Sequence, residues 1–426
     1  MGQRVSVATR RNAKRSGNNW PSPRLNIDVP LILVILTLVG FGLLMMHSAS
    51  WNASLLLTKD NVEGSSTTYL FYRQLRWLGV GFVALIALTW INYHRWHYLS
   101  IIVMGVTLVS LLGVLIYGET VDDVTRAYFE GSIQPSELAK FAIVVYLAVW
   151  LNAKRDQLSD LGYGLFPLAI IVGITGGLIL RQPDLSAAAM VLILGGTMYY
   201  LAGSDAIQTG ILFLVTGLAG FFVLRFNPTD NNRVAVFKDG WNDILASSDH
   251  VKHSLVAFVR GEWIGVGIGH GTSKLTTLPF PHTDSVFAVI GEETGVIGAA
   301  FVVILFAIIF WRGLVIANNA PDGLGSLLAA GLTLWITLEA FMNMASLLGL
   351  MPFAGNTLPF FSIGGSNLVS TMAALGIVLN ISRLSERNQV EESRRNFGAI
   401  VDLRRWNRWR RISRPRRTRS ARRRSR

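Results

Sequence analysis

Repeated apolar runs of about 20 residues are the feature that most constrains the fold of this chain. A run of that length is what an α-helix needs to cross the hydrocarbon core of a bilayer. Hydrophobic residues make up 51% of the 426 residues and charged residues only 15%, whereas an ordinary soluble domain carries about 25% charged residues. The sequence therefore predicts a membrane protein with no large separate soluble domain.

We predict about ten membrane-spanning helices, so the fold class is an all-α polytopic membrane protein. The first run is long, lacks a small-residue cleavage site and is followed by further spans, so we expect a retained helix rather than a cleaved signal peptide. The longest connection, residues 226–284, falls between the seventh and eighth helices. The runs cover about residues 29–48, 75–92, 98–117, 136–152, 164–181, 185–202, 207–225, 285–311, 324–346 and 366–382.

Basic residues at the two ends of the chain set the predicted orientation. Residues 1–28 carry six Lys and Arg residues against one acid, and the positive-inside rule places such a segment in the cytoplasm. Ten spans of the membrane domain, residues 29–382, return the C-terminal tail to the same side. That tail, residues 383–426, has seventeen Arg residues against four acids, a net charge of +13 that equals the charge of the whole chain. The large 226–284 connection is then extracytoplasmic.

The Arg-rich tail is predicted to bind anionic lipid headgroups, at roughly 1 kcal/mol per basic residue near the membrane surface. RNA binding is the weaker interpretation, because a tail beside the last span already faces a membrane, so we expect no nucleic-acid partner. A disordered topology anchor is the other alternative. The glycine-rich stretch at residues 265–269 lacks the Lys-Ser/Thr ending of a P-loop and does not open a βαβ unit, which argues against nucleotide binding. The chain has no Cys, which excludes thiolate chemistry.

Ionisable residues inside or beside the predicted spans are the first functional candidates, because each costs about 2.5–3.5 kcal/mol on insertion scales. Glu137 and Lys140 lie three positions apart at the start of the fourth span, on one helix face. Lys140 would offer positive charge to an anionic ligand while Glu137 holds it in place, and a purely structural ion pair is the alternative. Asp184 begins the sixth span, where helix capping alone would also explain it.

Four carboxylates lie at or within the later spans. Asp284 begins the eighth span at the external water boundary, which is the position expected for a base that acts on a substrate from the outer leaflet. Glu292 and Glu293 lie roughly 12 Å farther along that helix and point in different directions, so at most one is expected to face a given cavity. Together with Glu339 of the ninth span they are interpreted as an intramembrane polar network, either structural or a proton or ion path.

Four ordered motifs within residues 30–382 resemble the SEDS family, the shape, elongation, division and sporulation proteins typified by FtsW and RodA, and FtsW more than RodA. The resemblance implies a peptidoglycan glycosyltransferase that polymerises lipid II into β-1,4-linked strands at the outer face of the bacterial cytoplasmic membrane. It also implies a class B penicillin-binding protein and other divisome or elongation proteins as partners. The motifs are Gln134-Pro-Ser-Glu-Leu-Ala-Lys140, Gln182-Pro-Asp-Leu185, His282-Thr-Asp284 followed by Gly291-Glu-Glu293, and Leu358-Pro359 leading to Gly364-Gly-Ser366.

The resemblance places the family's essential aspartate on Asp284. One general base suffices for an inverting transfer, because the acceptor's C4 hydroxyl loses a proton while a lipid diphosphate leaves. The diphosphate needs charge stabilisation from Arg, Lys, helix N-termini or a divalent ion such as Mg²⁺ or Mn²⁺, and the sequence does not identify metal ligands. The candidate substrate-binding residues are Arg126, Gln134, Glu137, Lys140, Asp184, Lys274 and Ser366.

The chain also departs from the family pattern. Tyr128 stands where Trp is common, Ser132 where some members have Arg, and Glu339 where glutamine is often found. Two other functions stay open: a flippase for lipid II or another polyprenyl-linked sugar, with the intramembrane Glu292, Glu293 and Glu339 as its polar path, and a non-catalytic division scaffold. The residues leave open whether the role is in division or in elongation.

Deleting residues 393–426 should leave turnover in detergent unchanged and weaken binding to anionic liposomes. The tail charge is predicted on the opposite side of about 30 Å of hydrocarbon from the site, far beyond a Debye length of roughly 8 Å at physiological salt. The comparison is turnover and liposome binding of the full-length and truncated chains, with neutral or anionic lipids at two salt concentrations. Equal binding by both chains would remove the lipid-anchor interpretation.

Overall fold

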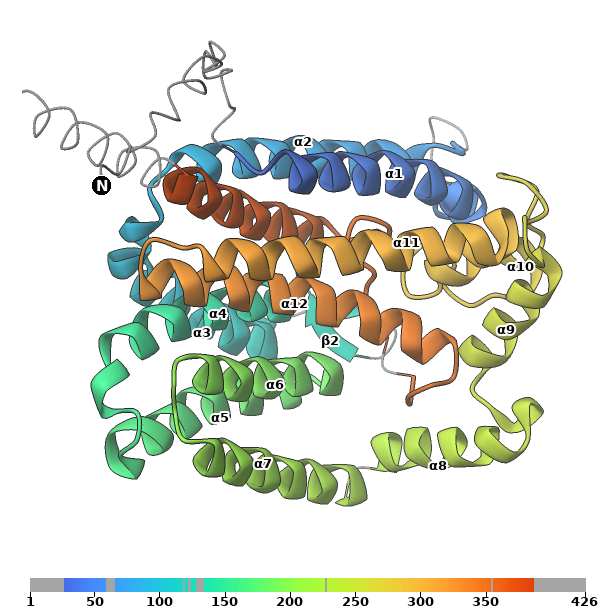
Figure 1. Cartoon of the computed structure of the whole chain (residues 1–426). Coiled ribbons are helices and arrows are strands. Elements are labelled where there is room, and N and C mark those ends of the chain that lie inside the picture. Colours follow the sequence, from blue (N-terminus) through green and yellow to red (C-terminus); the bar gives the residue numbers. More distant parts are fainter. Residues whose placement is uncertain are drawn as a thin grey trace, which may run out of the picture.

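In the computed structural model, long apolar helices pack side by side into one bundle, with shorter helices across one end (Figure 1). The structure describes residues 27–58, 66–117, 119–121, 124–127, 134–226, 228–353 and 355–386. Eight described helices are long and apolar enough to cross a membrane, and 185–201 and 206–222 are shorter apolar helices. The prediction of an all-α polytopic membrane protein is confirmed, and each predicted run overlaps one of these helices.

Two of the helices extend well past the predicted runs. The first continues ten residues beyond the run 29–48, and the eighth continues beyond 311 because Arg312 forms an ion pair with Asp28 that neutralises its charge. The bounds are α1 (Val29–Thr58), α2 (Tyr69–Trp90), α3 (Trp96–Tyr117), α4 (Pro135–Ala153), α5 (Phe166–Leu180), α6 (Leu185–Leu201), α7 (Ala206–Phe226), α11 (Val286–Asn318), α12 (Gly323–Leu347) and the last described helix, Gly365–Glu386.

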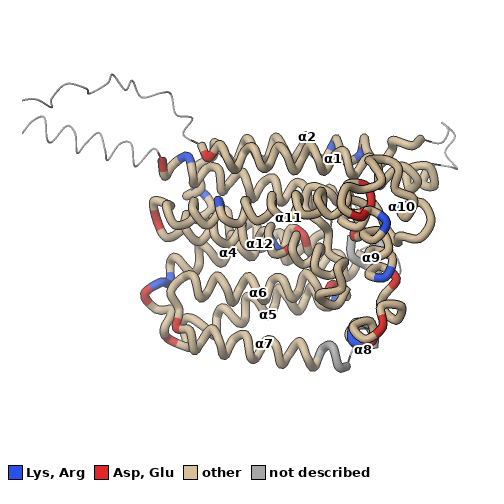
Figure 2. Tube along the Cα trace, turned by 45° about the vertical axis from the view of Figure 1, so that its right-hand side comes forward, with Lys and Arg blue, Asp and Glu red and all other residues tan. Residues whose placement is uncertain are grey.

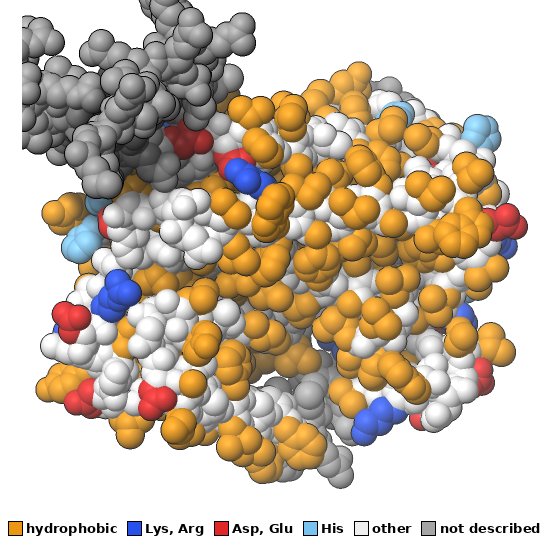
Figure 3. Space-filling view, in the orientation of Figure 1, with side chains coloured by type: hydrophobic (Ala, Val, Ile, Leu, Met, Phe, Trp, Pro, Cys, Tyr) orange, Lys and Arg blue, Asp and Glu red, His pale blue; other side chains and the backbone are white. Residues whose placement is uncertain are grey.

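The centre of the bundle is formed by α4, α12 and the last helix. In their most apolar stretches 67%, 78% and 78% of residues are buried, against 22% in α2 and 28% in α3, which lie at the rim. α12 packs against α11, α4 and α6, whereas α7 contacts mainly α6 and lies at the edge. Hydrophobic side chains cover much of the face in Figure 3, and most charged residues lie at the two ends of the bundle in Figure 2. This distribution suits helices that cross a bilayer.

The connections contain more structure than the sequence predicted. The 118–135 connection holds a short two-stranded antiparallel hairpin, β1 (Glu119–Val121) and β2 (Val124–Ala127), which lies outside the helices of this all-α membrane fold. The Val and Thr residues of this hairpin are β-branched, which favours extended backbone. The 226–284 connection forms α8 (Pro228–Asn242), α9 (Asp249–Gly261) and α10 (Ser273–Thr276), which lie together at one end of the bundle (Figure 1).

α11 is interrupted at Gly295, whose backbone (φ +70°, ψ −172°) is not helical. The segment that follows α9, residues 262–267, fills the interruption and supplies the hydrogen bonds that the helix loses. Gly265 lies so close that a Cβ there would be 2.2 Å from the Glu293 carbonyl oxygen. The glycine-rich stretch therefore packs against a broken helix. The bonds run from Val266 N to Glu292 O (3.0 Å), Gly267 N to Glu293 O (3.1 Å), Val296 N to Glu262 O (2.9 Å) and Ile297 N to Trp263 O (3.2 Å).

Gly295→Ala should destabilise the folded protein by at least about 2 kcal/mol, because a side chain is strained at this φ and its Cβ would lie 2.4 Å from the Trp263 carbonyl oxygen. Gly173→Ala in α5 is the matched control, because the space within 4 Å of the position that its new methyl group would take is open. The control should be neutral or stabilising by up to about 1 kcal/mol. Thermal unfolding in detergent measures both, and equal unfolding temperatures would contradict the account of the break.

Candidate active site

Asp284 lies half-buried in the turn that precedes α11. Two other segments hold the backbone of this turn: the C-terminal part of α12, and the loop of residues 355–364 that precedes the last helix. Since its backbone is bonded from both sides, the turn presents the Asp284 carboxylate in a defined direction. The bonds run from Asn343 Nδ2 to Asp284 O (2.9 Å), Ser362 Oγ to Thr283 O (2.6 Å) and Ile363 N to His282 O (2.9 Å).

The same loop passes directly beside the Asp284 side chain. A Cβ placed on Gly355 would lie 3.3 Å from Asp284 Oδ2, and the positive φ of Gly355 (+62°) is a conformation that suits glycine. Asn343 donates a second hydrogen bond to the Asn356 carbonyl and so bridges this loop and the Asp284 turn. The carboxylate is therefore positioned by two backbone segments that a single α12 amide joins.

Lys140 is buried between two carboxylates. Its Nζ lies 2.9 Å from Glu137 Oε1 on the same helix and 2.8 Å from Glu339 Oε1 on α12. The side chains of Lys140, Glu137 and Glu339 are 5%, 8% and 2% exposed, so solvent screens them little. Asn367 of the last helix donates to both carboxylates, at 2.7 and 2.8 Å. We call these four residues the Lys140 cluster.

Two further donors complete the Lys140 cluster from α12 and from the loop. Trp335 Nε1 donates to Glu339 Oε2 (2.7 Å) from one helical turn earlier, and Thr357 Oγ1 donates to Glu339 Oε1 (3.0 Å). The predicted Glu137–Lys140 ion pair is present. Because the ammonium lies within 2.9 Å of carboxylate oxygens from two helices, its positive charge is already compensated inside the cluster. Its contact with substrate stays a prediction.

Asp184 caps α6 and also links the starts of three helices. Its Oδ1 accepts from the Ala187 amide at 3.0 Å, which confirms the predicted capping. Its Oδ2 accepts from Ser136 Oγ (3.0 Å) and Gln134 Nε2 (3.2 Å) at the start of α4. The backbone N–H of Gln134 in turn donates to Ser366 Oγ of the last helix at 3.1 Å. Three predicted site residues, Gln134, Asp184 and Ser366, thus come together.

Glu292 and Glu293 form a cluster of their own, whereas the described partners of Glu339 belong to the Lys140 cluster, and the polar network of all three glutamates stays a prediction. Glu292 and Glu293 both bind the segment 269–274, because the break in α11 lets that segment pass over this part of the helix. Glu292 accepts from Thr272 N (3.1 Å), Ser273 N (3.1 Å) and Ser273 Oγ (2.9 Å), and Glu293 accepts from Gly269 N (3.0 Å), Lys274 Nζ (2.5 Å) and Ser48 Oγ (2.7 Å).

Lys274 therefore serves a structural ion pair in this structure. Its ammonium is buried against Glu293, with both side chains at most 5% exposed, and it also donates to Ser48 of α1. The same segment binds both neighbouring glutamates. The predicted role of Lys274 in substrate binding stays a prediction.

One segment, residues 355–367, contacts all three polar groups at this end. It bonds the Asp284 turn through Ser362 and Ile363, the Lys140 cluster through Thr357 and Asn367, and Gln134 through Ser366. Thr357 and Asn367 were not predicted, although Asn367 stands out as an amide at the edge of an apolar run. The Arg126 side chain, Tyr128, Ser132 and most of the two basic termini lie outside the described residues.

Two histidines near Asp284 are neutral at pH 7. Burial lowers the pKa of His250 on α9 to about 4, and burial also lowers the pKa of His282 in the turn. His250 is stacked against the Phe353 ring with centroids 4.0 Å apart. Neither imidazole therefore places a positive charge next to the carboxylate. Within the described ranges, no group of three or more His, Asp or Glu side chains is arranged to hold a metal ion.

Comparison with known proteins gives consistent matches along most of the chain. The profile of a cell cycle protein family, that of FtsW, RodA and SpoVE, matches residues 29–387. Stage V sporulation protein E of Bacillus subtilis (strain 168) is 33% identical over 365 residues, which are 84% of this chain and 97% of that protein. The probable peptidoglycan glycosyltransferase FtsW of Thioalkalivibrio sp. (strain K90mix) is 34% identical, over 84% of this chain and 90% of that protein.

Two solved structures are similar to the fold. A chain from a peptidoglycan synthase complex, described as coordinating polymerization and crosslinking, has a TM-score of 0.67 and 27% identity, over 85% of this chain and 99% of that chain. The rod shape determining protein RodA of Thermus thermophilus has a TM-score of 0.60 and 26% identity, over 85% of this chain and 98% of that chain.

The Lys140 cluster predicts unequal effects of two substitutions. Lys140→Met leaves two buried carboxylates without a cation and should cost about 3–5 kcal/mol of stability. Glu339→Gln keeps one carboxylate for Lys140 and mainly removes the acceptor of the Trp335 indole N–H, at about 1–3 kcal/mol. The double variant should be more stable than Lys140→Met alone, because one unpaired carboxylate is gone. Thermal unfolding in detergent ranks the three, and strictly additive losses would contradict a shared charge cluster.

Proposed function

This chain belongs to the cell cycle protein family of FtsW, RodA and SpoVE, and from that premise we propose that it is a peptidoglycan glycosyltransferase. Relatives about one-third identical over most of both chains carry that activity in their names. The observation that carries the proposal is the position of Asp284, held half-buried at the start of α11 by α12 and the 355–367 segment. The proposed substrate is lipid II, taken from the outer leaflet of the cytoplasmic membrane.

Asp284 acts in this proposal as the general base. Its carboxylate takes the proton from the C4 hydroxyl of the acceptor sugar, and the resulting oxygen attacks the anomeric carbon of the donor. The bond from that carbon to the diphosphate oxygen breaks, so the electron pair leaves with the polyprenyl diphosphate and the configuration inverts to β-1,4. A base positioned in this way typically contributes 10²–10⁴-fold to the rate.

Stabilisation of the leaving diphosphate falls to groups near Asp284. The last helix begins at Gly365, next to Ser366, and the N-terminal amides of a helix attract anions. Gln134 is fixed against that helix start and against Asp184, so its amide is held in place for a polar substrate group. A divalent cation such as Mg²⁺ or Mn²⁺ stays a prediction.

The partner is proposed to be a class B penicillin-binding protein, which would crosslink the strands that this chain makes. The similarity to a chain of a peptidoglycan synthase complex supports this pairing. Cytoplasmic termini and a place at the division septum complete the proposal. A continuous polar path of the kind expected for a flippase is less supported, because Glu339 has different partners from Glu292 and Glu293 among the described contacts.

Asp284→Asn should reduce polymerisation of labelled lipid II by about 10²–10⁴-fold, because the amide keeps the shape of the carboxylate but accepts no proton. Purified protein, with and without its penicillin-binding partner, is assayed for glycan products. The matched control is Asp249→Asn on α9, whose side chain is 72% exposed and pairs with Lys252 at the surface. Both variants should keep the wild-type unfolding temperature. Full activity of Asp284→Asn would exclude it as the base.

A further inference from the structure

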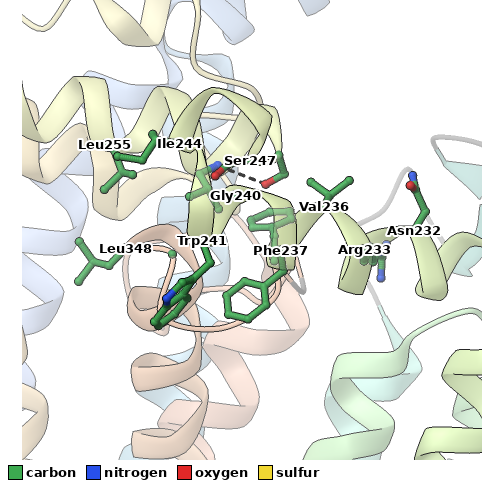
Figure 4. Close-up of a pocket in the computed structure, with 14 residues that line it drawn as sticks. Asn232, Arg233, Val236, Phe237, Gly240, Trp241, Ile244, Ser247, Leu255 and Leu348 are labelled. Atoms are coloured by element: carbon green, nitrogen blue, oxygen red, sulfur yellow. Dashed lines mark hydrogen bonds between the residues drawn. The ribbon is translucent and has the colours of Figure 1, made fainter.

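A pocket of about 400 Å³ lies between α8, α9 and the turn that follows α12. Phe237 and Trp241 of α8 lie next to one another on its wall, with ring centroids 5.8 Å apart, and Leu348 lies on the Trp241 side (Figure 4). Asn232 and Arg233 contribute polar atoms to its lining from the same helix. We call this the α8–α9 pocket. Its volume lies in the range of small-molecule sites, about 300–1,000 Å³.

The α8–α9 pocket shares one aromatic wall with the Asp284 turn. Phe353 lines the pocket, and its ring stacks on His250 with centroids 4.0 Å apart and an angle of 13°. His250 Nδ1 lies 3.1 Å from Ser285 Oγ, one residue after Asp284. Contacts through Phe353, His250 and Ser285 therefore link the pocket to the turn that carries the proposed base. A polymer that extends away from Asp284 in this direction would meet the pocket next.

The lining of the pocket matches the chemistry of a sugar chain. A sugar ring presents apolar C–H faces that pack on aromatic rings and hydroxyl groups that need hydrogen-bonding partners. Phe237, Trp241 and Phe353 offer the first kind of contact. The second kind comes from polar residues of the lining, and burying polar groups against a purely hydrocarbon chain would be unfavourable. These residues are Asn232, Arg233, Ser247 and Ser248.

The pocket also lies outside the candidate membrane spans, since α8 and α9 are not among them. We propose that the α8–α9 pocket is a glycan subsite, which holds a repeat of the newly made strand beside the catalytic turn. The inference rests on the proposed function, because it assumes that this chain makes glycan. A strand held there keeps its end at a high effective concentration near Asp284, so the next addition precedes release.

Direct binding tests the pocket without requiring catalysis. The probes are lipid-free, uncrosslinked glycan fragments of two to four disaccharide repeats, titrated into the full-length protein in detergent. Wild type and Asp284→Asn should bind the fragments with equal affinity. Trp241→Ala should bind them at least about 10-fold more weakly. Trp241 is 69% exposed, so its truncation is compatible with folding. Trp263→Ala is the matched control, because Trp263 is 71% exposed and does not line the pocket.

Product length supplies the second test. With labelled lipid II, Trp241→Ala should make shorter strands than wild type and Trp263→Ala, because its strands are released earlier. The glycan subsite would be overturned if no form of the protein bound the fragments, or if Trp241→Ala bound them as tightly as wild type. Neither result would overturn the proposed function, which the polymerase assay tests separately. Displacement of bound fragments by a polyprenyl monophosphate would also overturn it and would identify a lipid-chain site instead.

Discussion

A lysine ammonium that is buried among helices must keep its carboxylate partners, and this requirement determines how the middle of the bundle comes together. Lys140 brings α4 to Glu339 of α12, and Asn367 fixes the last helix to the same two carboxylates. Removing the lysine from such a group leaves two carboxylates without a cation, which costs several kcal/mol. The 355–367 segment then has a defined start and end, so its middle holds the Asp284 turn in place.

The parts of this site that were predicted from the sequence are those that depend on the spacing of residues along a single helix. Glu137 and Lys140 lie three positions apart, and Asp184 directly precedes an apolar run, so the ion pair and the cap follow from helix geometry alone. Glu339 is 199 positions from Lys140. Apolar periodicity reports which face of a helix is buried but not which residue of a distant helix lies opposite, so this partner was not predictable. The family resemblance, rather than periodicity, singled out Asp284 as the base.

The break in α11 is a second case in which a contact between distant segments could not be predicted from the sequence. The sequence displays both halves of the contact, a glycine-rich stretch at 265–269 and Gly295 inside an apolar run, but only the folded chain shows that they pair. Without the partner, a glycine cluster suggests a phosphate loop and a lone glycine suggests an ordinary helix. The hairpin at 119–127 was missed because its strands are shorter than any pattern of alternation that the sequence establishes.

The two polar clusters also differ in the order in which a growing chain completes them. The segment after α9 pairs with α11 across about 30 residues, and Lys274 reaches Glu293 across 19, so this unit needs only nearby sequence and α1, which is already made. Asn367, by contrast, lies 230 positions after Glu137. During synthesis, the contacts of Lys140 are therefore complete only after most of the chain has been made. The Asp284 turn forms its contacts with residues 355–363 only when the final span is made. The end of the bundle that holds the Asp284 turn is thus assembled last, after the rim helices that enclose it.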